Sequence, residues 1–195
     1  MLQPAEDTAL TFHHVAYSSE SFKQPFYYGL RVGTFFDRLN WAGLELEFIH
    51  SKAYARTSHE VDVDGRLHGE PYRARIPMRQ WLRDFSFSHG LNFALVNAVG
   101  RRAWKNVAFY GRFGLGLCIP HTETTFEGFH REQYDLTFPV VQVAPGLAVK
   151  LWHHFQWLAG YKFIYARVHG VRIYHGTANT RFLMHHFVFG VGWRR

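Results

Sequence analysis

The chain has 195 residues, and its 22 lysines and arginines outnumber its 15 aspartates and glutamates. It has no apolar run of about twenty residues, which excludes a transmembrane helix, and its single cysteine excludes an internal disulfide. No helical or aromatic RNA-binding motif accompanies the positive charge, and we therefore expect no nucleic-acid partner.

Eight strands are predicted in chain order, at residues 10–18, 27–36, 42–51, 85–97, 107–119, 138–151, 156–168 and 180–193. The strand pattern is weakest at residues 10–18. Short links at 37–40, 98–106 and 152–155 alternate with long polar links at about 52–84, 120–137 and 169–179. Alternating short and long links are typical of bacterial outer-membrane barrels, which have tight periplasmic turns and longer outer loops.

Bulky apolar residues occupy every second position of these segments, and the positions between them hold small residues and a few charges. Glycine weakens an exposed strand, whereas the crowded lumen of a narrow barrel needs small residues. We therefore interpret the bulky face as the outer, lipid-facing surface. The residues assigned to it include Leu44, Leu46, Phe85, Phe87, Leu91, Phe93, Leu95, Phe113, Leu115, Val143, Phe187 and Trp193.

The expected fold is therefore all-β, an eight-stranded antiparallel up-and-down transmembrane barrel in the bacterial outer membrane, with residues 1–195 as one domain. Glu45, Glu47, Arg112 and Lys162 are expected to pair across its lumen. The alternative is a soluble lipocalin-like or streptavidin-like barrel, which requires large apolar residues inside. A channel is disfavoured, because side chains fill so narrow a lumen. Residues 1–4 do not form a secretion signal, so we expect that a leader was removed or is not included.

Arginines are frequent in the long links and suggest a phosphate-bearing partner. Arg79 and Arg83 lie in the longest link and Arg131 in the next. Arginine binds phosphate with two parallel hydrogen bonds, and the outer leaflet beside such loops displays phosphorylated lipid. These three residues are therefore candidates for holding the phosphates of lipopolysaccharide. The alternative is a solvated loop surface, since acidic residues are interspersed among them.

The histidines carry the candidate chemistry. His50, His89 and His121 are predicted at the loop-side ends of three neighbouring strands, facing outward at the height of a lipid headgroup. Glu123 lies two residues beyond His121 and therefore on the same side of an extended chain. His50, His89, His121 and Glu123 are candidate catalytic residues. Of these, His89, His121 and Glu123 match the two-histidine, one-carboxylate ligand set of non-haem iron, which copper or zinc can also use. The alternative is a set of interfacial histidines with no catalytic role.

Several short sequences also carry a family resemblance. They are Glu-Phe-Ile-His-Ser-Lys-Ala-Tyr-Ala at 47–55, Phe-Ser-His-Gly-Leu-Asn at 87–92, Pro-His-Thr-Glu at 120–123, Tyr-Lys-Phe at 161–163 and His-His at 185–186. Together they resemble bacterial outer-membrane barrels of the lipid A oxidase family. The resemblance implies an eight-stranded barrel that uses molecular oxygen to oxidise the proximal glucosamine of lipid A to 2-aminogluconate. It assigns no catalytic residues to this chain.

The leading functional expectation is thus an enzyme that modifies lipid A, acting as a monomer among outer-membrane lipids with a divalent iron or copper ion. The alternative is a non-catalytic barrel that serves as a structural, adhesion or loop-display scaffold. A hydrolase resembling lipid A deacylase would need His-x-Ser on one strand face. No His-x-Ser occurs here, and simple alternation places Ser88 and His89 on opposite faces.

Overall fold

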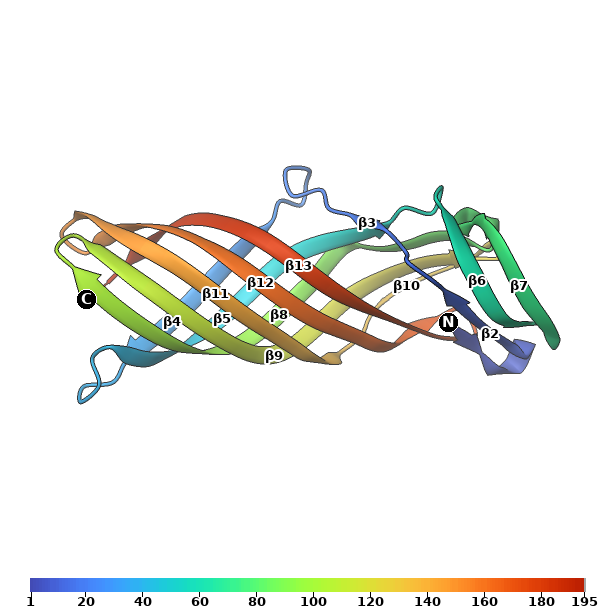
Figure 1. The fold of residues 1–195 in the computed structure, drawn as a ribbon, viewed down its shortest axis with the longest axis horizontal. Coiled ribbons are helices and arrows are strands. Elements are labelled where there is room, and N and C mark those ends of the chain that lie inside the picture. Colours follow the sequence, from blue (N-terminus) through green and yellow to red (C-terminus); the bar gives the residue numbers. More distant parts are fainter. Residues whose placement is uncertain (195) are drawn as a thin grey trace.

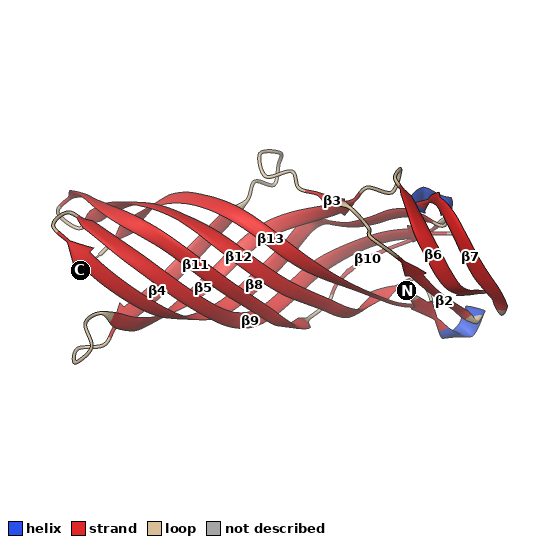
Figure 2. Ribbon diagram, viewed as in Figure 1, coloured by secondary structure: helices blue, strands red, loops and turns tan. Residues whose placement is uncertain are grey.

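The computed structural model describes residues 1–194, which form a single antiparallel sheet with two one-turn 3-10 helices. Neither helix is long enough to cross a membrane. Figure 2 shows how completely strands make up the described chain. The all-β, antiparallel class expected from the alternating pattern is confirmed.

Seven strands, which we call the wall strands, coil around a common axis into an elongated cylinder (Figure 1). They are β4 (Tyr28–Phe35), β5 (Ala42–Ala55), β8 (Leu82–Trp104), β9 (Val107–Phe126), β11 (Thr137–Trp152), β12 (Phe155–Ile173) and β13 (Gly176–Trp193). Each pairs antiparallel with the next in this order. We call the end of the cylinder with the short turns and the C-terminus the turn end, and the opposite end the hairpin end.

The remaining elements lie at the hairpin end. They are β1 (Leu2–Gln3), η1 (Pro4–Glu6), β2 (Thr8–Phe12), β3 (Tyr17–Ser18), β6 (Glu60–Leu67), β7 (Glu70–Pro77), η2 (Met78–Gln80) and β10 (Phe129–Tyr134). The sheet continues from β13 through β1 and β2 to the β6–β7 hairpin, while β10 folds back on β9. The links predicted at 52–84, 120–137 and 169–179 are therefore largely strand, and the predicted link at 98–106 shortens to a turn after Trp104.

The structure differs from the predicted closed eight-stranded barrel in strand number and in closure. The sheet has thirteen strands, and no strand ladder joins β4 to β13 among the described residues. The segment 10–18, predicted as one wall strand, is instead divided between two short strands. Thr8–Phe12 pairs with β1 and β6, and Tyr17–Ser18 pairs with β5. Seven of the eight predicted strands thus match wall strands, and the curled sheet has two free edges.

The outer surface of the cylinder is apolar and its interior at mid-height is charged, as predicted. Leu46, Phe113 and Phe187 are 65%, 57% and 77% exposed. Inside, the buried Glu47 carboxylate accepts hydrogen bonds from Gln142 at 2.6 Å and from Lys162. These three residues come from β5, β11 and β12. The predicted Arg112–Glu45 pair also forms, at 2.6 Å.

One group of residues was assigned to the wrong face. Phe85, Phe87, Leu91, Phe93 and Leu95 of β8 are buried rather than lipid-facing. The reason is which alternate residues of β8 point into the cylinder. Asn97 donates a hydrogen bond to the lumenal Glu47, so odd-numbered residues of β8 point inward. At the hairpin end they form an interior apolar core. Its members include Leu10, Val61, Val63, Phe126, Ile164, Ile173 and Phe182.

Candidate functional site

An irregularity between β8 and β9 shapes the candidate site. Ser86 pairs with Glu123 and Leu91 pairs with Pro120, so β8 takes five steps (86 to 91) where β9 takes three (120 to 123). The two extra residues form a bulge that includes Gly90, whose φ of +145° is rarely adopted by residues with a side chain. The bulge redirects the side chains beside it, and both Ser88 and His89 reach toward β9.

Three side chains of β8 and β9 meet at the carboxylate of Glu123. The Ser88 hydroxyl donates a hydrogen bond to Glu123 Oε1, and His89 Nδ1 lies 2.5 Å from the same oxygen. His121 Nδ1 lies 3.6 Å from it. One nitrogen each of His89 and His121 and one carboxylate oxygen of Glu123 all lie within 4.8 Å of one another. We call these three residues the His–Glu cluster.

The cluster is partly enclosed. The side chains of His121 and Glu123 are 11% and 14% exposed, whereas His89 is exposed to solvent. The ring of Tyr134, on β10, packs against His121 with centroids 4.3 Å apart. Among the described residues, His121 Nδ1 is buried without a hydrogen-bond partner. A buried imidazole nitrogen with no protein partner, within 4.8 Å of two other ligand atoms, suits a metal ion.

Electrostatics keeps Glu123 ionised. Burial alone would raise the pKa of this carboxyl, but the hydrogen bonds from Ser88 and His89 outweigh burial, and the pKa lies below its usual value. The nearby Asp84 behaves oppositely, because burial and the negative charge of Glu123 raise its pKa. An ionised carboxylate beside two imidazoles can bind a cation or accept a proton.

His50, predicted to join this group, lies outside it. Its Nδ1 pairs with the Asn92 side chain at 2.7 Å, and its ring stacks on Tyr28 at 5.0 Å. The prediction placed all three histidines at one level, but the bulge in β8 moves His89 toward β9, and Asn92 is left opposite His50. The structure therefore brings together His89, His121 and Glu123 and separates His50 from them.

The three candidate phosphate-binding arginines have different surroundings. Arg131 donates to Gln133 Oε1 at 3.0 Å and to the Ile173 carbonyl oxygen at 3.4 Å, so its guanidinium points toward β12. Arg79 and Arg83 are exposed, and among the described residues their guanidinium groups make no hydrogen bond or ion pair. Phosphate binding by these three arginines stays a prediction.

Two residues of the site were not predicted from the sequence. Ser88 was excluded by alternation, although Gly90 two residues later is a signal for a bulge. Tyr134 lies in a segment expected to be loop, and only the pairing of β10 with β9 places it opposite His121. Nothing in the local sequence indicates that pairing.

The contact between Ser88 and His89 differs from a hydrolase triad. The Ser88 hydroxyl lies 3.0 Å from Nδ1 of His89, the same nitrogen that meets Glu123. In a serine triad the nucleophile and the carboxylate use different ring nitrogens, so that the imidazole can pass a proton between them. Here Ser88 acts as a hydrogen-bond donor that orients Glu123.

The cluster lies at the edge of the apolar outer surface. Leu115 and Leu117 are exposed on β9, and His121 and Glu123 continue the same face toward the hairpin end. Comparison of the chain with protein-family models, with curated proteins and with solved structures finds no match.

Proposed function

We propose that this protein is an outer-membrane barrel enzyme that acts on lipopolysaccharide and oxidises the proximal glucosamine of lipid A with molecular oxygen. The observation that carries the proposal is the convergence of His89, His121 and Glu123 at the edge of an outward-facing apolar surface. A lipid headgroup would lie at this height beside the protein.

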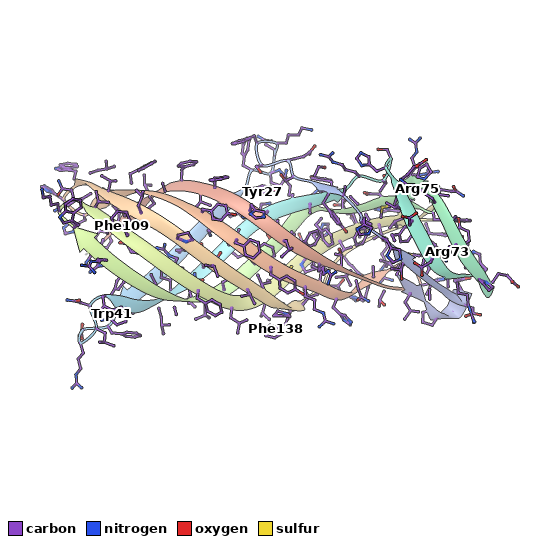
Figure 3. The ribbon with its side chains drawn as sticks, in the orientation of Figure 1. Tyr27, Trp41, Arg73, Arg75, Phe109 and Phe138 are labelled. Carbon is purple, nitrogen blue, oxygen red and sulfur yellow. The ribbon has the colours of Figure 1, made fainter. Side chains whose placement is uncertain are left out.

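The membrane location is supported by the inverted distribution of side chains. Large contiguous apolar surfaces are rare on soluble monomers, whereas a band of exposed apolar residues around a polar interior is typical of membrane barrels. The turn end adds a group of exposed aromatic residues, as Trp41 and Phe109 illustrate in Figure 3. Exposed tryptophans near this end also include Trp104, Trp152 and Trp193. Aromatic side chains favour the boundary between lipid and water.

The ligand set fits a redox-active divalent ion, iron or copper. Two imidazole nitrogens and one ionised carboxylate would hold it from one side, leaving the exposed side open. The ion would supply the electron transfer to oxygen that no side chain in this set provides. Ser88 would keep Glu123 oriented, and Tyr134 would hold the His121 ring in place.

In the proposed reaction, the anomeric carbon of the proximal glucosamine changes from a hemiacetal to a carboxylic acid. Two electrons and two protons pass to molecular oxygen, which becomes hydrogen peroxide, and water supplies the added oxygen atom. The two protons come from the anomeric C–H and O–H groups and leave with the hydrogen peroxide.

Mass spectrometry of lipid A tests the proposal. Cells whose lipid A has a free anomeric hydroxyl group, and which make the protein, should contain lipid A heavier by one oxygen atom, and this species should be lost with His89→Ala or His121→Ala. His153→Ala, in an exposed turn at the opposite end, is the matched control and should retain it. Unmodified lipid A in all four strains would overturn the enzymatic proposal.

A non-catalytic scaffold is the second candidate, and the β6–β7 hairpin favours it. One face of this hairpin packs Val61 and Val63 on the core, while Arg73 and Arg75 lie opposite Asp64 and Asp62 on the other face (Figure 3). A projecting, highly charged hairpin could bind a surface partner without chemistry. This function predicts normal lipid A in every strain.

A further inference from the structure

The two free edges of the wall flank a position for one more strand. Every adjacent pair of wall strands is antiparallel, so β4 and β13, at the two ends of the series, run in the same direction. A strand between them would have to run antiparallel to both. The edges border the same space, since Arg31 of β4 and Val188 of β13 line one cavity. Tyr27, just before β4, also lies 6.0 Å from the His186 ring.

The short strand β1 already occupies the start of this position. Leu2 pairs antiparallel with Thr177, on the edge of β13 that faces away from β12. The backbone stays extended as far as Met1, whose N-terminal amine donates a hydrogen bond to the Leu10 carbonyl oxygen at 2.8 Å. Because the pairing is antiparallel, the line of β1 followed backward from Leu2 runs along β13 toward Trp193. That line passes through the free position beside β4.

The chemistry of the gap indicates what kind of strand would fit. Its lumenal side is positively charged, because four cations outnumber two carboxylates there; they are Arg31, Lys52, Arg112 and Lys162 against Glu45 and Glu47. Its outer side continues a surface of exposed apolar residues such as Val32 and Val191. A fitting strand would therefore present apolar residues outward and small or acidic residues inward.

A second copy of this chain does not meet the requirement. Two copies inserted in the same orientation are related by an axis along the membrane normal, which preserves strand direction. The β4 strand of one copy would then meet β13 of the other in parallel. Only a strand of opposite direction continues the antiparallel order.

We propose that the gap between β4 and β13, which we call the seam, is an acceptor site for one antiparallel β-strand that leads into Met1 and closes the barrel. The inference rests on the proposed membrane location, because unpaired backbone N–H and C=O groups are costly in lipid and spanning sheets must close. It is independent of the proposed oxidation.

Disulfide trapping with an added strand tests the seam. The chain, with Cys118→Ser, is extended before Met1 by about ten residues that alternate valine outward with serine or glutamate inward, the length of a membrane strand. One outward position of the extension carries a cysteine. It is combined with Phe187→Cys on β13, which the pairing of Leu2 with Thr177 places opposite the ninth residue before Met1, or with Val32→Cys on β4, and oxidised in phosphatidylcholine vesicles. The proposal predicts cross-links to both strands.

The matched control has the same extension with its alternation shifted by one residue, which places the apolar side chains inward and should abolish both cross-links. Absence of cross-links with the correct extension, or a cross-link to only one strand, would overturn the acceptor site. Lipid A mass spectra of cells that make the same extended variants distinguish the seam proposal from the oxidation proposal. Oxidised lipid A without cross-links refutes only the seam, and cross-links with unmodified lipid A refute only the oxidation.

Discussion

Nδ1 of His89 lies 2.5 Å from Oε1 of Glu123, although 34 residues separate the two in the chain. The contact depends on the bulge in β8, which adds two residues opposite β9 and turns His89 toward its neighbour. Bulges often redirect a side chain next to a functional site. The candidate chemistry thus depends on a local departure from regular strand pairing.

Replacing Gly90 tests that dependence. In Gly90→Ala the new Cβ would lie 2.5 Å from the Asn92 side chain, at a φ of +145° that alanine adopts only with strain. We expect a loss of about 1 kcal/mol or more in unfolding free energy and weaker metal binding, because the bulge must rearrange. Urea unfolding in detergent and titration with Cu²⁺ measure the two effects. Gly128→Ala, which also has positive φ but open space around it, should leave metal binding unchanged. Equal Cu²⁺ affinity in Gly90→Ala and the parent would contradict the role of the bulge.

The affinity for Cu²⁺ should distinguish the metal-binding residues of the His–Glu cluster from the residues beside it. His121→Ala removes a ligand and should lower Cu²⁺ affinity by more than Ser88→Ala does. Ser88→Ala removes only the hydrogen bond that orients Glu123, which should cost about tenfold. His50→Ala, which alters a histidine outside the cluster, should have no effect. Isothermal titration calorimetry measures all three, and equal losses in His50→Ala and His121→Ala would indicate nonspecific binding by surface histidines.

The lumenal ion pair should be necessary for stability. Glu47→Ala leaves the buried Lys162 without its carboxylate partner, and breaking a buried pair in this way typically costs about 3–5 kcal/mol. Changing both residues, as in Glu47→Gln with Lys162→Met, removes both charges and should recover part of the loss. Urea midpoints in detergent report the difference. A single variant as stable as the parent would show that the pair contributes nothing.

The hairpin end should loosen as pH rises. The exposed His68, in the β6–β7 turn, pairs with Glu127 of the β9–β10 turn at 2.8 Å, and this hydrogen bond raises its pKa above the usual 6.5. A raised folded pKa gives stabilisation that is complete below the unfolded value and is lost as pH rises through the folded value. Hydrogen exchange of β7 should therefore speed up above pH 6.5 relative to Glu127→Gln at the same pH. An identical pH response in the two proteins would contradict this tether.

The sequence predicts the wall strands well, because alternation with bulky outward residues continues for many residues in β9, β11 and β13. It fails for β8, where Phe85 and Phe87 lie in an interior apolar core. Near the hairpin end the apolar residues of β8 alternate with Ser86, Ser88 and Gly90, but periodicity alone cannot say whether the apolar face meets lipid or an interior core. The lumenal contact of Asn97 decides the parity, and that contact is visible only in three dimensions.

The candidate site was predicted for reasons that are only partly correct. His121 and Glu123 follow Leu117 at even spacing, and simple alternation places them correctly. His89 faces outward in the structure too, but it does so through the bulge, which also brings in Ser88 and leaves His50 opposite Asn92. Long-range pairing of β10 with β9 supplies Tyr134, and no local pattern specifies a pairing of that kind.

The membrane assignment depends on the apolar face pointing outward into lipid, and spin-label accessibility in vesicles measures this orientation. A nitroxide is attached at Phe113→Cys on the outer face or at Arg73→Cys on the hairpin, each with Cys118→Ser, and power saturation is measured with oxygen and with a water-soluble nickel complex. We expect the label at position 113 to collide mainly with oxygen, which concentrates in lipid, and the label at position 73 to collide mainly with nickel. Greater accessibility to nickel at position 113 would place this surface in water and contradict the membrane assignment.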